Sequence, residues 1–135
     1  MVLVSSQDND LVFQSYGRCC RREQFFEDFY SVFLGKSDAV RGMFSSTNMT
    51  EQRRLLRAGI TWLLMYARGA PGGKLHHLGE THSRKGYDVN PALYGLWVEA
   101  LMESVQRHDP DYSLELDQRW RNVLRPGIEV ISGAW

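Results

Sequence analysis

Apolar residues in every long patterned segment of this chain recur at intervals of three and four residues. This spacing places them on one side of an α-helix, whereas a half-buried strand would alternate polar and apolar residues. The segment 48–68 is the clearest case, with an apolar side made of Leu55, Leu56, Gly59, Ile60, Leu63 and Leu64. The pattern therefore predicts an all-α fold, in which amphipathic helices bury their apolar sides against one another.

The predicted helices cover 9–20, 22–34, 38–44, 48–68, a short segment between 73 and 86, 90–108 and 113–131. Ser37 and Asn48 are suited to cap the third and fourth helices. Asn90 followed by Pro91 favours the start of the sixth. Pro126 falls inside the last segment, and because proline removes a backbone hydrogen bond we expect a kink or break there. Gly59 would let another helix approach the fourth closely.

Length and charge limit the classes of protein that fit. A chain of 135 residues is expected to form one domain, 1–135. Its 16 basic and 16 acidic residues cancel, which argues against nucleic acid or an anionic membrane as partner. The longest apolar run, 60–67, is too short to span a bilayer. Adjacent Cys19 and Cys20 do not readily bond to each other, and no signal peptide is evident, so we expect a cytoplasmic protein.

One histidine lies on the apolar side of a predicted helix. In the segment Leu75-His76-His77-Leu78-Gly79-Glu80-Thr81-His82, the residues Leu75, Leu78 and His82 share a face. His76 and His77 lie about 120–140° from that face, at 100° per residue, and are expected in solvent. Such a histidine is commonly a structural core residue. From this segment alone, His82 could therefore be either a structural core residue or a metal ligand.

Two further polar side chains occur among apolar residues. Tyr30 belongs to the aromatic segment 25–34, most of which we expect in the core, and Gln52 precedes Leu56 by one turn. Buried Tyr, Gln and His side chains all require hydrogen-bond partners. Two packed helices, one with the histidine and one with Gln52 and Leu56, would leave a slot. A flat apolar cofactor with a central metal would fill that slot.

These residues resemble the globin family in its bacterial single-domain, three-over-three form, including the globin part of flavohaemoglobins. The resemblance covers roughly residues 9–132. Its motifs are Phe29-Tyr30-x-x-Phe33, Val40-Arg41-Gly42-Met43-Phe44, Gln52-x-x-x-Leu56, Leu78-Gly79-x-x-His82-x-x-x-Gly86 and Trp120. It implies a globin fold of about seven helices around a haem slot that holds one haem b, iron protoporphyrin IX.

The resemblance also implies roles for single residues. His82 would be the proximal iron ligand through Nε2, with Nδ1–H bonded to a backbone carbonyl, most simply that of Leu78. Tyr30 and Gln52 would lie on the distal side, where both can donate hydrogen bonds to a partly charged diatomic ligand. The haem would be lined by Phe44, Leu56, Leu75, Leu78, Val89, Tyr94 and Trp97. The candidates for binding the haem propionates are Thr81, Arg84 and Arg54.

The function implied by the resemblance is reversible binding of O2, and of NO and CO, for storage, delivery or sensing. The alternative is an NO dioxygenase, which would need an external reductase because these 135 residues contain no flavin or nicotinamide domain. A third hypothesis, a haem-free interaction domain, gives no reason for the polar pair Tyr30 and Gln52. Peroxidase activity is disfavoured, because Gln52 stands where a distal acid–base histidine would be needed.

Overall fold

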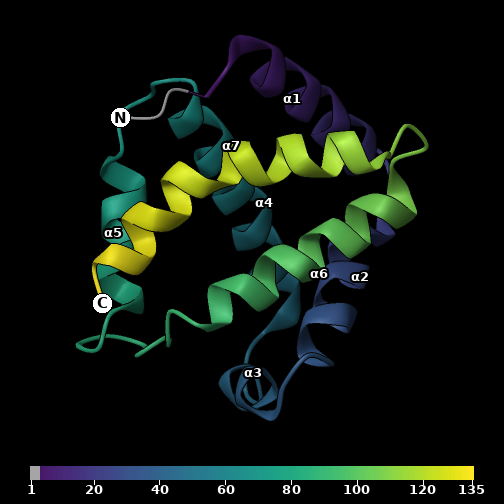
Figure 1. Ribbon diagram of the computed structural model, residues 1–135. Coiled ribbons are helices and arrows are strands. Elements are labelled where there is room, and N and C mark those ends of the chain that lie inside the picture. The colour runs from purple at the N-terminus through teal and green to yellow at the C-terminus, as the bar shows by residue number, and fades with distance from the viewer. Residues whose placement is uncertain (1–3) are drawn as a thin grey trace.

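The computed structural model describes residues 4–135, and no strand occurs among them (Figure 1). The helices are α1 (Ser6–Cys20), α2 (Gln24–Leu34), α3 (Asp38–Met43), α4 (Met49–Ala67), α5 (Gly73–His82), α6 (Leu93–His108) and α7 (Leu114–Gly133). The all-α class and the number of helices expected from the sequence are confirmed. Within the described part of the chain, no helix is both long and apolar enough to cross a membrane.

Side-chain caps determine where four of the helices begin. Ser37 and Asn48 each accept a hydrogen bond from an N–H in the first turn of α3 and α4, as predicted. Ser5 and Ser113 cap α1 and α7 in the same way. Because Ser5 satisfies a free N–H group, α1 begins at Ser6 rather than near residue 9.

The predicted start of α6 is wrong, and the prediction for Pro126 in α7 is met only in part. Helix α6 begins at Leu93, because Asn90 Oδ1 accepts the N–H of Ala92 at 2.9 Å and forms a turn before the helix. A kink or a break was expected at Pro126, and α7 continues through it to Gly133 without a break. The ribbon of α7 instead changes direction towards its yellow, C-terminal half (Figure 1).

The close helix contacts occur at Gly79 and Gly127 rather than at Gly59. A Cβ atom on Gly127 would lie 2.5 Å from Leu63 Cδ2, and one on Gly79 would lie 2.8 Å from the Cβ of Ala134. At Gly59 no atom lies within 4 Å of such a Cβ, so the prediction for that glycine is wrong. The two close contacts hold α7 against α4 and α5, the helix that ends with the candidate histidine.

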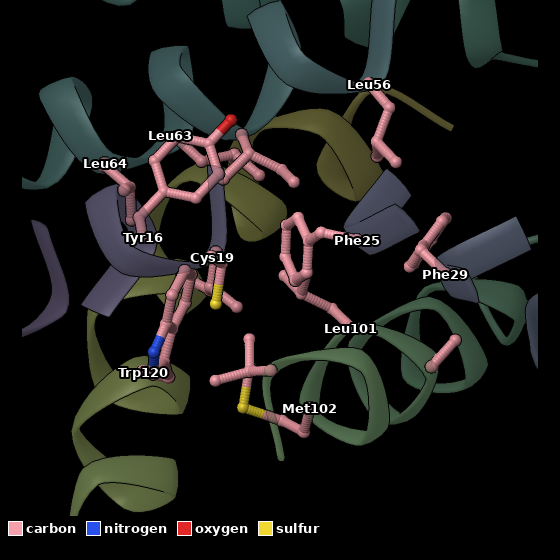
Figure 2. Close-up of a cluster of buried hydrophobic side chains, with 14 of the residues drawn as sticks. Tyr16, Cys19, Phe25, Phe29, Leu56, Leu63, Leu64, Leu101, Met102 and Trp120 are labelled. Carbon is pink, nitrogen blue, oxygen red and sulfur yellow. The ribbon is translucent and has the colours of Figure 1, made fainter. Parts of the chain in front are cut away.

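Aromatic side chains connect the helices in the core. Helix α2 packs on α6, and α7 packs against α1, α4 and α5. Figure 2 shows Tyr16 and Cys19 of α1 beside Trp120 of α7. The rings of Tyr16 and Trp120 have centroids 6.1 Å apart at 86°, and those of Tyr16 and Phe25 are 6.4 Å apart at 64°. Such edge-on pairs each contribute about 0.5–1.5 kcal/mol beyond their buried area.

A buried polar network joins α1 to the loop before α7. Ser15 Oγ donates to Asp109 Oδ2 at 2.5 Å and accepts the Trp120 Nε1–H at 2.9 Å. Arg18 Nε and Nη2 lie 2.7 and 3.0 Å from the same carboxylate. Burial raises the pKa of Asp109, but the hydrogen bonds from Arg18 and Ser15 outweigh burial and hold that pKa below its usual value. The carboxylate is therefore ionised at neutral pH.

Replacement of Ser15 by Ala is expected to lower the free energy of unfolding by about 1–3 kcal/mol. The substitution removes a donor to Asp109 and leaves the buried Trp120 N–H without its acceptor. Urea unfolding followed by circular dichroism measures the change. Ser31→Ala, at an exposed position of α2, is the matched control. An equal unfolding midpoint for Ser15→Ala and the unmodified protein would show that the network adds no net stability.

Candidate functional site

His82 is the last residue of α5, and the preceding turn of the helix holds its ring. His82 Nδ1 lies 2.8 Å from the carbonyl oxygen of Leu78, so the predicted hydrogen bond is confirmed. Because a carbonyl only accepts, Nδ1 carries the proton and Nε2 keeps its lone pair. Burial lowers the pKa of His82 below its usual value, although the bond with Leu78 opposes this effect. The ring is therefore neutral at pH 7, the state in which imidazole binds metals.

The chain turns directly after His82 and bonds back to the end of α5. Val89 N–H donates to the His82 carbonyl at 2.9 Å, and Tyr87 N–H donates to the Thr81 carbonyl at 2.8 Å. A side chain at Gly86 would overlap with the Thr81 carbonyl, so glycine is needed in this turn. The turn fixes the backbone of the histidine and brings the backbone of Val89 next to it. A contact of Val89 with haem stays a prediction.

Tyr87 is a neighbour of the histidine that the sequence patterns do not single out. Its ring centroid lies 6.1 Å from that of His82, with the planes at 75°, and the residue is 78 % exposed. Tyr87 lies in a loop where no helical period applies. Only the fold of the turn shows that it lies beside the imidazole.

Tyr30 is the centre of a second group of predicted residues. Its ring lies edge-on to Phe44, with centroids 5.6 Å apart, and its hydroxyl donates to the Gln52 backbone carbonyl at 3.4 Å. Tyr30 is 5 % exposed, and burial raises its pKa to about 12, so the phenol keeps its proton at neutral pH. Gln52 is half-buried and Leu56 is buried. The structure thus brings Tyr30, Phe44 and Gln52 together and leaves the phenol able to donate.

The remaining predicted residues are distributed over α5 and α6. Leu75 is buried, whereas Leu78, Tyr94 and Trp97 are half-buried. Burial raises the pKa of Tyr94 to about 12. Within residues 4–135, no hydrogen bond or ring contact joins the residues around His82 to those around Tyr30. The site therefore consists of two groups, one on α5 and the following turn, the other on α2, α3 and α4. Trp97 of α6 adjoins the second group, because its ring lies edge-on to that of Phe29 with centroids 5.7 Å apart.

The three propionate candidates have partners within the protein. Thr81 Oγ1 donates to the Leu78 carbonyl at 3.0 Å. The Arg84 guanidinium lies 4.9 Å from the ring centroid of Trp135, and Arg54 pairs with a glutamate on its own helix. Contacts with propionates stay predictions for all three. The backbone carbonyl of Thr81 also accepts the Tyr87 N–H in the turn after His82.

The chain has a structural relative among proteins of known structure. No family model matches the chain, and no curated protein matches it. A crystal structure of a Pseudomonas aeruginosa protein, described as structurally highly homologous to a human haemoglobin, superposes with a TM-score of 0.93. The two sequences are 48 % identical, over 95 % of this chain and 98 % of that chain. This identity over nearly the whole length, together with the all-α fold, shows that the chain belongs to the globin family.

Proposed function

We propose that this globin holds one haem b through His82 and reversibly binds O2, for storage, delivery or sensing. The proposal rests chiefly on the state of the His82 imidazole. Its Nδ1–H is bonded to the Leu78 carbonyl at 2.8 Å, and the ring is neutral. Nε2 therefore presents a lone pair whose direction is set by the helix.

The residues present suit haem by their chemistry. One neutral imidazole is a common protein ligand of haem iron. Half-buried apolar side chains offer surface that a porphyrin would cover, and these are Phe44, Leu78, Val89, Tyr94 and Trp97. When bound, haem would supply an iron with an open coordination position for O2, NO or CO.

Tyr30 and Gln52 would act on the gas by donating hydrogen bonds. The Tyr30 hydroxyl keeps its proton at neutral pH, and its 3.4 Å bond to the Gln52 carbonyl is long for O–H···O. Little free energy is then lost when the hydroxyl turns to a better acceptor. The Gln52 side chain adds an amide N–H donor without a basic nitrogen. Leu56 would exclude water from the same side.

Absorption spectra of the purified protein in the ferric, ferrous and CO-bound forms test the proposal. We expect haem bands in all three, a shift of the main band with CO and a five-coordinate ferrous form. The last expectation follows because α4 carries Gln52 and no histidine. A protein that takes up no haem on reconstitution, or a sharp bis-imidazole ferrous spectrum, would contradict it.

Repeated turnover of NO distinguishes O2 binding from the dioxygenase alternative. The O2-loaded protein is mixed with excess NO, with and without NADH and a purified flavoprotein reductase. For a binding protein we expect about one equivalent of nitrate and then ferric protein in both samples. Continuous nitrate production that depends on the reductase would instead support the enzyme.

Gln52→Leu is expected to speed O2 dissociation by about two- to thirteenfold, since one neutral hydrogen bond contributes roughly 0.5–1.5 kcal/mol. The substitution removes the amide donor and keeps a side chain of similar volume. Stopped-flow displacement of O2 by CO measures the rate. Gln106→Leu, at an exposed position of α6, is the control. Equal rates in Gln52→Leu and the unmodified protein would remove Gln52 from the ligand site.

A further inference from the structure

A groove lies on the surface between α6 and α7. Figure 1 shows the two helices diverging from the loop that joins them. The groove has a volume of about 320 Å³ and is lined by half-buried Tyr94, Val98 and Ile128 and by buried Leu124. Its other lining residues are Gly95, Glu99, Arg121, Arg125 and Glu129. The groove therefore presents an apolar surface with charged side chains of both signs around it.

The charged residues of the groove differ in their partners. Arg121 Nη1 lies 2.7 Å from Glu99 Oε1, so this pair joins α7 to α6 within the chain. Arg125 and Glu129 are exposed, and neither forms an ion pair with another residue of the described range 4–135. In a pair that does form along α7, Asp117 with Arg121, the acid comes first, which is the favoured order. Arg125 precedes Glu129, so both charges remain available to another chain.

The charges of the groove are complementary to those of a second copy. Two arginines and two glutamates line it, so their formal charges cancel. A strongly acidic or basic partner therefore meets no net attraction there, whereas a second copy offers an opposite charge for each one. When a two-fold axis lies perpendicular to α7, the two copies of this helix run antiparallel and every contact occurs twice. Arg125 of one chain then lies opposite Glu129 of the other.

We propose that two copies of the chain form a dimer through this groove. Arg125 of each chain pairs with Glu129 of the other, across an axis that passes near Ile128. The half-buried side chains Ile128 and Val98 of the two copies cover one another, which removes apolar surface from water. This inference goes beyond the proposed function and does not depend on haem.

Charge reversals, measured by sedimentation equilibrium on the full chain as purified, test the inference. We expect the unmodified protein to dimerise reversibly at micromolar concentrations. Arg125→Glu and Glu129→Arg each bring like charges together at two symmetric positions, so each variant should dimerise about tenfold more weakly. The double variant Arg125→Glu/Glu129→Arg again places opposite charges together and should dimerise like the unmodified protein. A mixture of the two single variants should form mixed dimers more tightly than either variant dimerises alone.

Arg107→Glu and Glu27→Arg are the matched controls, because both residues are exposed and neither lines the groove. Both controls should dimerise like the unmodified protein, and circular dichroism should show the same helix content in all variants. A protein that stays monomeric at every concentration overturns the inference, whether the groove is empty or holds a small molecule detected by native mass spectrometry. A dimer that is unaffected by the single reversals, that the double variant does not restore, or that the controls weaken equally, overturns it as well.

Discussion

His82→Ala is expected to yield a protein that is purified without haem, or that holds haem only when imidazole is added. Alanine is the best helix former, so α5 should keep its backbone while the one side chain that presents Nε2 is lost. Imidazole from solution can then enter the space and replace the ligand. The ratio of haem to protein absorbance, and the iron–imidazole stretch with and without added imidazole, measure both outcomes.

His76→Ala and His77→Ala are the matched controls for this variant. Both histidines lie on the exposed side of the same helix, so their removal takes an imidazole from α5 without touching the apolar side. Both variants should retain haem at the level of the unmodified protein. An unchanged iron–imidazole stretch in His82→Ala, with its loss in either control, would assign the proximal ligand to another residue.

Those features of the fold that depend on neighbours in the sequence could be predicted. A cap and its N–H, such as Ser37 with α3 or Asn48 with α4, lie within one turn. The bond from His82 to the Leu78 carbonyl also spans one turn. Helical geometry alone therefore fixes these contacts, whatever the rest of the chain does.

The features that were wrong, or right only in part, depend on tertiary packing. An interior proline costs a helix about 3 kcal/mol or more, yet α7 continues through Pro126. The next residue, Gly127, is buried close to Leu63 and Leu75, so packing against α4 and α5 holds the helix together there. Asn90 can cap a helix or a turn equally well. The choice of a turn depends on how the chain returns from α5.

In the candidate site too, contacts within one helical turn could be predicted, whereas contacts that depend on tertiary structure could not. The hydroxyl of Thr81 could donate either to a haem propionate or to the Leu78 carbonyl. In the structure it donates to the carbonyl, and this depends on the side-chain rotamer of Thr81, which cannot be predicted from the sequence. The rings of Tyr87 and His82 lie close together because of a turn, and the hydrogen bonds of that turn do not repeat at a regular spacing along the sequence. Residues within helices, such as Tyr30 and Gln52, could be assigned to one face of a helix. The sequence did not predict that the Tyr30 hydroxyl bonds to the backbone carbonyl of Gln52 rather than to its side chain.

Tyr30→Phe is expected to accelerate O2 dissociation by about tenfold to a hundredfold. The substitution keeps the ring that packs on Phe44 and removes only the hydroxyl. A hydrogen bond to a charged acceptor contributes about 1.5–3 kcal/mol, which corresponds to that range of rates. In the protein without bound O2, removal of the hydroxyl should lower the free energy of unfolding only slightly, because its hydrogen bond to the Gln52 carbonyl is 3.4 Å long. Stopped-flow displacement of O2 by CO measures the rate.

Tyr16→Phe is the control that separates this role from packing. The Tyr16 hydroxyl also donates to a backbone carbonyl of α4, that of Arg57 at 3.0 Å, and its ring also lies in the core. The two variants therefore remove the same group from similar surroundings. Tyr16→Phe should lower the free energy of unfolding and leave the rate of O2 dissociation unchanged. Tyr30→Phe should increase the rate of O2 dissociation and change the free energy of unfolding little. Equal dissociation rates in the two variants would make Tyr30 a core aromatic residue, and the distal donor would then have to be Gln52 alone.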